Sequence, residues 1–354
     1  MRYSYLKTKH IEVELSSICN AACPQCPRNV YGGKTIDDLP LQSWTYEEYV
    51  TAFSKDTLQK LESMYFCGTF GDPMSAKDIL RICEYVKECN PHIKLGLHTN
   101  GGLRTKALYA RLADVVDYVV FGIDGLEDTN HLYRRHVRFS KVIENATTFI
   151  AAGGIAEWDF IVFKHNQHQV ETAKAYSEKL NFRKFNIKKT SRFLNKAHVL
   201  VDSLDVQNDD GEKAYTIYPP TDTKYFNNTL STFKQTNIHD YAMNTTIECF
   251  YCTHDMIYID VTGIVWPCGW VMDRLYGVEA KQTRDHQVVK GFLDQVTEKD
   301  TNCKMNSIES IIHGPWFNML QDTWTNNNRL ERCGLQCGKI NHIAGQNIDV
   351  EYKN

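Results

Sequence analysis

The twelve cysteines of this chain fall into groups whose spacing suits metal binding. Cys19, Cys23 and Cys26 form a C-x3-C-x2-C triplet near the N-terminus. A second set lies in the last third of the chain and comprises Cys249, Cys252, Cys268, Cys303, Cys333 and Cys337. The first ten residues carry no secretory signal, so we expect a reducing, cytoplasmic compartment. Clustered thiols there serve metal or redox chemistry rather than disulfides.

The triplet supplies three thiolates and leaves one metal position unfilled. A tetrahedral zinc ion would need a fourth ligand close by, and none of the residues between the cysteines is a good one. A [4Fe–4S] cluster held by three cysteines would instead expose one iron to a substrate or cofactor. The spacing favours the cluster. A zinc site completed by a distant His or Cys, and three unligated cysteines, are the alternatives.

The elements that must position these thiols alternate in type from residue 11 to about 190. The expected strands are Ile11–Leu15, Ser63–Cys67, Ile93–His98, Tyr118–Ile123, Trp158–Phe163 and Lys184–Lys189. The expected helices are Tyr46–Lys60, Ala76–Asn90, Thr105–Ala113, Ser140–Ala152 and Gln167–Leu180. Such alternation predicts an α/β fold with parallel strands, as an open sheet or a whole or partial barrel, whose site lies at the carboxyl ends of the strands. The triplet directly follows the first strand and therefore lies at that end.

The rest of the chain reads differently. Residues 200–248 are rich in Asn, Thr, Asp and Tyr without a sustained period, and we interpret 196–248 as a linker or surface excursion. From Cys249 onward the pattern predicts a hairpin, Ile257–Asp260 with Ile264–Trp266, and a helix over Ile308–Trp324. We expect this part to be a small C-terminal module carrying the second cysteine set.

Composition excludes several partners. The 40 basic and 43 acidic side chains give a net charge of −3, which leaves no field to attract nucleic acid or an acidic membrane. No apolar run approaches the ~20 residues that span a bilayer. Phosphate-loop, nucleophile-elbow and zinc-helix motifs are also absent from the sequence.

The triplet after a first strand, followed by a repeated β-α pattern, resembles the radical S-adenosylmethionine (radical SAM) superfamily. The resemblance implies a partial (β/α)6 barrel over residues 8–195 that holds a [4Fe–4S] cluster ligated by Cys19, Cys23 and Cys26. It also implies that SAM chelates the open iron and is cleaved to methionine and a 5′-deoxyadenosyl radical, which abstracts a substrate hydrogen. An electron donor such as flavodoxin or ferredoxin would reduce the cluster.

Three turns match those that contact SAM in this family. Gly68–Pro73 follows the second strand and carries Asp72 where the family has a glutamate that receives the SAM ammonium; a helix cap is the alternative role of Asp72. The turns His98–Gly101 and Gly122–Gly125 follow the third and fourth strands. The resemblance thereby assigns as candidate SAM contacts Gly71, Asp72, Thr99, Asn100 and Asp124, and the charge of Arg134 makes it a further candidate.

The sequence departs from the family at two of these places. Gln25 replaces the aromatic residue that many members carry before the third cysteine, and Gly122 replaces an expected hydroxyl. One ribose or carboxylate contact is therefore missing or supplied elsewhere. The basic residues that could neutralise a carboxylate of SAM or substrate, or be solvated surface charges, are Arg134, Arg135, Lys164 and Arg192.

The second cysteine set resembles the auxiliary-cluster extension called SPASM, or Twitch in its shorter form, through Cys252-x10-Gly263-x4-Cys268. We expect the module to span 249–345. Two fully ligated [4Fe–4S] clusters would need eight cysteines and only six are present, so one auxiliary iron–sulfur cluster is expected. Its predicted ligands are Cys249, Cys252, Cys268 and Cys337, with Cys333 as a substitute for Cys337. A structural zinc with the same ligands is the alternative.

The remaining cysteines have weaker claims to a role. We expect Cys67, Cys83 and Cys89 to be small buried hydrophobic residues. We expect Cys303 to be a free loop thiol, with hydrogen-atom donation or a further ligand role as alternatives.

The resemblance leaves the reaction open and assigns no catalytic side chain. Relatives with such modules act on peptides or proteins, or on aminocyclitol-like small molecules. The expected function is therefore modification of a peptide or protein residue; a small-molecule dehydrogenase or rearrangement enzyme and a zinc-bearing binding protein are the alternatives. Gly269 stands where related oxidising enzymes carry an acidic residue, although Asp273 or Asp255 could be recruited as a base.

Overall fold

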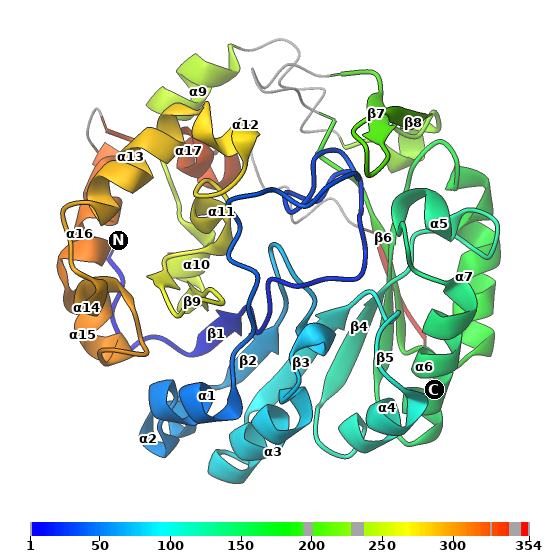
Figure 1. The fold of residues 1–354 in the computed structure, drawn as a ribbon, viewed down its shortest axis with the longest axis horizontal. Helices are drawn as coiled ribbons and strands as arrows, with labels where there is room; N and C mark the ends of the chain where they lie inside the picture. The colour runs from blue at the N-terminus through cyan, green and yellow to red at the C-terminus, as the bar shows by residue number, and fades with distance from the viewer. Residues whose placement is uncertain (1, 194–200, 228–236, 326–327, 340–347, 353–354) are drawn as a thin grey trace.

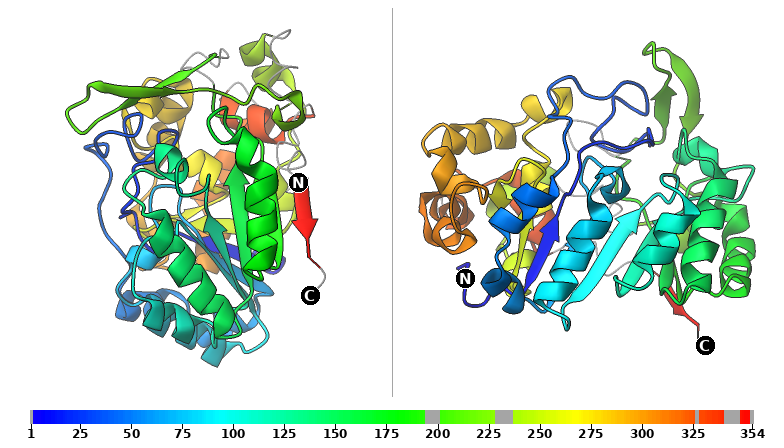
Figure 2. Two further views of the ribbon diagram at one scale, coloured as in Figure 1. Left: turned by 90° about the vertical axis from the view of Figure 1, so that its right-hand side faces the viewer. Right: turned by 60° about the horizontal axis from the view of Figure 1, so that its bottom comes forward.

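The computed structural model describes residues 2–193, 201–227, 237–325, 328–339 and 348–352. Its centre is a nine-stranded sheet with the spatial order β10-β9-β1-β2-β3-β4-β5-β6-β11. Strands β1 to β6 run parallel and are neighbours in chain order, with helices packed outside the curved sheet (Figures 1 and 2). These strands are β1 (His10–Val13), β2 (Ser63–Phe66), β3 (Lys94–Thr99), β4 (Tyr118–Gly122), β5 (Ala156–Ile161) and β6 (Lys184–Lys188). The predicted six-fold β-α repeat and partial barrel are confirmed.

The helices between these strands also follow the prediction, although the first is divided in two and the short α5 was not predicted. They are α1 (Tyr46–Ala52), α2 (Lys55–Gln59), α3 (Ile79–Cys89), α4 (Lys106–Leu112), α5 (Asn130–Tyr133), α6 (Phe139–Ala151) and α7 (Val170–Lys179). The buried residues of α3 recur at helical spacing, with Ile79, Ile82, Cys83 and Val86 facing the sheet. Cys83 and Cys89 are buried, as predicted. Within the described ranges no helix has the length and apolar character needed to cross a bilayer.

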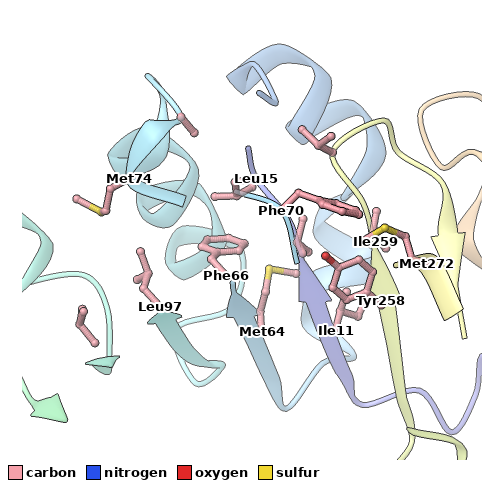
Figure 3. Packing of buried hydrophobic residues seen from close by; sticks show 14 of the residues in the cluster. Ile11, Leu15, Met64, Phe66, Phe70, Met74, Leu97, Tyr258, Ile259 and Met272 are labelled. Carbon is pink, nitrogen blue, oxygen red and sulfur yellow. The ribbon is translucent and has the colours of Figure 1, made fainter. Parts of the chain in front are cut away.

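Each barrel strand has two different faces. On β1, Ile11 and Val13 are buried against the helix layer, and Figure 3 shows Ile11 close to Met64 of β2. Because side chains alternate along a strand, Glu12 and Glu14 face the inside of the barrel. We call this inner side, lined by the inward-facing residues of β1 to β6, the lumen. Polar residues on otherwise apolar strands therefore mark the functional side of the sheet.

The predicted C-terminal hairpin is present and extends the sheet of the barrel. Strand β9 (Met256–Ile259) pairs in parallel with β1, and β10 (Val265–Trp266) pairs antiparallel with β9. The auxiliary cysteines are therefore attached to the barrel through a shared sheet. The remaining helices of this part are α9 (Ile238–Asn244), α10 (Phe250–Thr253), α11 (Gly269–Met272), α12 (Val278–Lys281), α13 (Arg284–Leu293), α14 (Glu298–Thr301), α15 (Ile308–His313), α16 (Pro315–Asp322) and α17 (Glu331–Cys337).

The single helix predicted over 308–324 is wrong in one respect. The chain divides at Gly314 into α15 and α16, because Pro315 has no backbone N–H to continue the first helix. The indole of Trp316 is fully buried, and its Nε1 donates to the carbonyl of Val265 at 2.7 Å. This bond anchors α16 to the hairpin, as expected of a packing residue.

The segment interpreted as a linker contains regular structure. Strands β7 (Leu204–Gln207) and β8 (Lys213–Ile217) form an antiparallel hairpin that projects beside the barrel at the carboxyl ends of its strands (Figure 2). The Tyr215 hydroxyl donates to the Leu132 carbonyl at 2.8 Å, which fixes the hairpin to the barrel. Residues 196–200 and 228–236 of the predicted linker lie outside the described residues. A strand that the sequence did not predict, β11 (Ile348–Glu351), pairs antiparallel with β6.

Candidate functional site

The cysteine triplet occupies the loop that leaves β1, at the carboxyl end of the sheet. Burial raises the pKa of Cys23 to about 11, and the charge of the neighbouring Cys26 adds to the effect. The pKa of Cys19 is raised in the same way, with contributions from Cys23 and Cys26. The three thiols therefore lie within electrostatic reach of one another, as the triplet spacing predicted.

N–H groups point at these sulfurs. The backbone N–H of Ala21 donates to Cys19 Sγ at 3.3 Å, and Asn100 Nδ2 donates to the same sulfur at 3.5 Å. The backbone N–H of Arg28 lowers the pKa of Cys26 against the effect of burial. Hydrogen bonds of this kind stabilise thiolates and tune the potential of iron–sulfur clusters.

The three thiols are neighbours on one loop. Among the described residues, no three His, Cys, Asp or Glu side chains are arranged to hold a single metal ion. The thiols of the triplet are nevertheless close enough to shift one another's pKa. Three thiolates on one loop would leave one iron of a [4Fe–4S] cluster open, as expected from the triplet.

Asp72 connects two of the predicted SAM turns. Its carboxylate accepts from the backbone N–H of Met74 at 2.9 Å, from the Thr99 hydroxyl at 2.9 Å and from the backbone N–H of Asn100 at 2.8 Å. It therefore caps the short turn after β2, which was the alternative role given to it. Burial raises its pKa and these bonds oppose that rise. Asp72 also contributes to the raised pKa of Cys19, so it lies near the cluster loop.

Gly71 allows the turn after β2 to approach the cluster loop. A Cβ at this position would lie 1.7 Å from the carbonyl oxygen of Ser16, so no other residue fits without a backbone shift. The N–H groups of Phe70 and Gly71 donate to Glu14 Oε1 at 2.7 and 3.0 Å. Glu14, which sequence reasoning missed, thus anchors this turn. A charged residue within an apolar strand was the signal that could have revealed it.

Asp124 and Arg134 form a buried ion pair beside the cluster loop. Arg134 Nε donates to Asp124 Oδ2 at 2.6 Å, and its Nη1 lies 3.8 Å from Cys23 Sγ. The Asp124 side chain is 0% exposed and that of Arg134 16%. Asp124 Oδ1 also accepts from the backbone N–H of Ile161 at 2.6 Å. The pair therefore holds a cationic group directly against one predicted cluster ligand.

The glycine that replaces a hydroxyl after β4 now has an explanation. A Cβ on Gly122 would lie 2.2 Å from Arg134 Nη2. The guanidinium thus occupies the place where the family's hydroxyl was expected. A side chain at position 122 would collide with Arg134, so the glycine and the buried arginine require each other.

The other three basic candidates make different contacts. Arg192 Nη1 donates to the Gln25 carbonyl at 2.7 Å, and its charge lowers the pKa of Cys26. Arg135 donates instead to the carbonyls of Gly32 and Gln207, so it joins the cluster loop to the hairpin and does not offer its charge to a carboxylate. Lys164 is exposed over the ring of Tyr218. Of the four, Arg134 and Arg192 are the ones whose charge lies near a thiol of the triplet.

Gln25 performs a different task from the aromatic residue that it replaces. Its Nε2 donates to the Arg192 carbonyl at 3.2 Å, and its Oε1 accepts from the Thr190 hydroxyl at 3.1 Å. It therefore ties the cluster loop to the segment after β6.

The second cysteine set converges at the end of the C-terminal part. Cys249 and Cys268 lie at the N-termini of α10 and α11, while Cys333 and Cys337 lie on α17. A hydrogen bond with the Cys337 thiol lowers the pKa of Cys249 to about 7. The Tyr3 hydroxyl lies 3.3 Å from Cys249 Sγ. The charges of Cys268 and Cys249 raise the pKa of Cys333, so these thiols share one environment.

Some members of this set line a small recess and one does not. Four of the cysteines line it, namely Cys249, Cys268, Cys333 and Cys337. Cys252 lines a different, open hollow against the N-terminal residues, together with Tyr3 and Lys7. Its pKa is raised to about 11 by burial and by the charge of Cys249, so it remains a neighbour of the group.

The lumen between the two cysteine sites contains an acid that the sequence did not single out. The Tyr251 hydroxyl donates to Glu12 Oε2, and the Cys268 charge contributes to the raised pKa of Tyr251. The proposed substitutes for an acidic residue at Gly269 lie elsewhere. Asp273 is paired with Arg274 and Arg332, and Asp255 lines the outer hollow.

Cys67 and Cys303 have surroundings that the sequence did not specify. Cys67 is half-buried at the end of β2, and the charges of Glu12 and Glu14 raise its pKa, which places it on the lumen side rather than in the apolar core. Cys303 is only 4% exposed and its backbone N–H donates to the Gly263 carbonyl. It is a free thiol in the loop between α14 and α15, as expected, but it is buried under the hairpin turn.

Comparisons with known proteins agree with this geometry. Residues 13–176 match the family model described as the radical SAM superfamily. No curated protein matches this chain. The fold is similar to that of SuiB from Streptococcus suis bound to S-adenosylmethionine, with a TM-score of 0.56 and 14% identity over 95% of this chain and 73% of that one. The same protein bound to its precursor peptide SuiA gives a TM-score of 0.53 at 14% identity, covering 95% and 77%. Native anSMEcpe with bound AdoMet and a Kp18Cys peptide gives 0.54 at 17% identity, covering 93% and 88%.

Proposed function

We propose that this SAM-dependent radical enzyme, whose residues 13–176 match the radical SAM family model, modifies a residue of a peptide or protein through hydrogen abstraction. The observation that carries the proposal is the cysteine triplet beside the buried Arg134–Asp124 pair. When bound, the [4Fe–4S] cluster would supply the electron that cleaves SAM. An electron donor such as flavodoxin or ferredoxin would be required to reduce it.

The residues around the triplet have distinct roles in this proposal. Cys19, Cys23 and Cys26 hold the cluster. Arg134 is fixed by Asp124 in a position to pair with a carboxylate close to Cys23. Asp72 lies near Cys19 and offers negative charge to an ammonium, while its bonds to Thr99 and Asn100 hold the turns after β2 and β3 together. Gly71 provides the close approach of these turns to the cluster loop.

The second cysteine set is proposed to hold one auxiliary iron–sulfur cluster. The recess lined by Cys249, Cys268, Cys333 and Cys337 supports this set of ligands, with Cys252 as the alternative fourth member. The Tyr251–Glu12 hydrogen bond links its surroundings to the lumen.

A peptide substrate is supported by two features. SuiB and anSMEcpe have been solved with bound peptides and share this fold. In this chain the β7–β8 hairpin is joined to the cluster loop, since the backbone N–H of Gln207 donates to the Tyr31 carbonyl at 3.0 Å. The hairpin therefore offers a surface next to the mouth of the barrel where an extended chain could be held.

Anaerobic reconstitution with iron and sulfide, followed by an assay for 5′-deoxyadenosine from SAM and dithionite, tests the proposal. We expect Cys23→Ala to abolish SAM cleavage. Cys268→Ala should retain some uncoupled cleavage and lose substrate turnover, because its thiol belongs to the other site. Zinc in place of iron, with no 5′-deoxyadenosine formed, would contradict the proposal. If both variants cleave SAM like the parent, the division of labour between the sites is wrong.

A further inference from the structure

A polar pair on the lumen wall is not used by the SAM site as described. Asp159 on β5 and Asn186 on β6 are register partners, and their strand neighbours Trp158 and Phe185 pack together on the opposite face. Asp159 is 9% exposed and Asn186 is 4% exposed. Asn186 Nδ2 donates to Asp159 Oδ1 at 2.7 Å. This bond fixes the orientation of the amide, because the reverse orientation would set two acceptors against each other.

The other amide atom is left without a partner. Asn186 Oδ1 is buried and accepts no hydrogen bond from the described residues. Buried polar atoms are nearly always paired in folded proteins, and an unpaired one lowers stability. A ligand that brings an N–H or O–H group to this oxygen would remove that cost. The atom therefore points to a hydrogen-bond donor on the substrate.

The charges around the pair favour a cationic donor. Asp159 Oδ2 lies 3.5 Å from Lys188 Nζ, a long ion pair. Glu12 accepts from the Tyr251 hydroxyl and makes no ion pair with any described residue. Both Asp159 and Glu12 contribute to the raised pKa of Tyr65, so this ring lies within reach of the two carboxyls. Burial raises the pKa of Glu12, so Asp159 is the group that offers negative charge beside the amide, and its cationic partner Lys188 is held only at the longer distance.

The groups around Asp159 other than Lys188 do not neutralise its negative charge. Burial lowers the pKa of His98 to about 4, so its ring is neutral at physiological pH. Arg134 is also close to His98, but its charge is balanced by Asp124. The ring of Tyr65 stacks on that of Tyr118 at 6.0 Å between centroids. Aromatic faces attract cations, which adds to the preference.

We propose that the lumen binds a protonated alkylamine of the substrate, with Asn186 Oδ1 accepting one ammonium N–H and Asp159 supplying the opposite charge. This inference rests on the proposed function, because the lumen is where a substrate hydrogen would meet the radical. It narrows the substrate to a lysine-like side chain or a small amine.

Calorimetric titration of the reconstituted protein with N-acetyl-lysine N-methylamide tests the inference, with the norleucine derivative as a probe that lacks the ammonium. We expect the lysine probe to bind at least about tenfold more tightly, since hydrogen bonds to charged groups are worth at least this much. Cyclohexylamine, titrated in parallel, distinguishes a small amine from a side chain. Equal binding of the lysine and norleucine probes would overturn the inference.

Two substitutions localise the site. Asn186→Leu removes the acceptor and should weaken binding of the lysine probe about tenfold, whereas Asn186→Asp should strengthen it. Glu62→Gln, an exposed carboxylate near the other end of the sheet, serves as the control and should leave binding unchanged. Circular dichroism verifies that each variant is folded. Unchanged affinity in both Asn186 variants would overturn the inference.

SAM carries an ammonium group of its own, so the titration is repeated with saturating SAM. Displacement of the lysine probe by SAM would assign the pair to SAM and refute the substrate site. If the parent protein does not bind the lysine probe but still forms 5′-deoxyadenosine normally, only this inference is refuted and the proposed function stands.

Discussion

Removing the Arg134 guanidinium should destabilise the fold as well as the SAM site. In Arg134→Met, Asp124 loses the one cation that pairs with it among the described residues, while it remains fully buried. Breaking a buried ion pair in this way costs about 3–5 kcal/mol. We expect the free energy of unfolding to fall by about 3 kcal/mol, at the lower end of that range, because Asp124 keeps the N–H of Ile161 as a donor.

The loss should depend on pH with a definite sign. Burial already raises the pKa of Asp124 in the parent, and the cation opposes that rise. Without Arg134 the folded-state pKa rises further above the unfolded value of about 3.9, so the folded variant binds its proton more tightly than the unfolded chain does. The variant is therefore penalised more as pH rises, and its deficit relative to the parent should be larger at pH 8 than at pH 5.

Urea unfolding of the cluster-free, reduced protein, followed by circular dichroism at pH 5 and pH 8, measures this difference. The double variant Asp124→Asn/Arg134→Met is the matched control, because it removes both charges and should recover part of the loss. A deficit below about 1 kcal/mol, or one that is the same at both pH values, would show that the pair is not the buried, mutually dependent unit that we describe.

Two other substitutions test the turn after β2. Burial raises the pKa of Glu14 to about 8. The stability that Glu14 contributes is therefore present below its unfolded pKa and is lost as the pH rises toward 8. Glu14→Gln keeps the Oε1 acceptor without the charge, so in urea unfolding at pH 8 this variant should be more stable than the parent by at least ~1 kcal/mol. No crossover between pH 5 and 8 would contradict the burial of this charge. Gly71→Ala places a Cβ against the Ser16 carbonyl and should cost about 3 kcal/mol or prevent folding. The control Gly291→Ala, where a Cβ meets open space within α13, should be neutral or stabilising by ~0.5 kcal/mol in the same melting experiment; similar melting temperatures for the two alanine variants would refute the close approach at Gly71.

The sequence predicted those features that local patterns determine. The alternation of strands and amphipathic helices gave the barrel, since side-chain periodicity alone decides which face of each element is buried. The triplet was found because its cysteines lie within eight residues of one another. The hairpin of β9 and β10 was also predicted, although its parallel pairing with β1 was not, because pairing between distant strands leaves no local signal.

What the sequence missed depends on contacts across the fold. Gly122 was interpreted as a lost contact, because only the folded chain shows that Arg134 fills its space. Arg134 and Arg135 are adjacent in sequence and equal in type, yet one binds Asp124 and the other clamps backbone carbonyls. Asn186 carried no signal at all, since an unpaired amide oxygen can be recognised only once its surroundings are known.

The central claim is that Cys19, Cys23 and Cys26 hold a cluster with one iron open to SAM. Electron paramagnetic resonance of the dithionite-reduced Cys268→Ala/Cys337→Ala variant tests it most directly, because this variant should retain only that cluster. We predict one [4Fe–4S]⁺ signal whose g values shift when SAM is added, and its loss on further substitution of Cys23. A signal that ignores SAM, or one that survives the Cys23 substitution, would contradict the account.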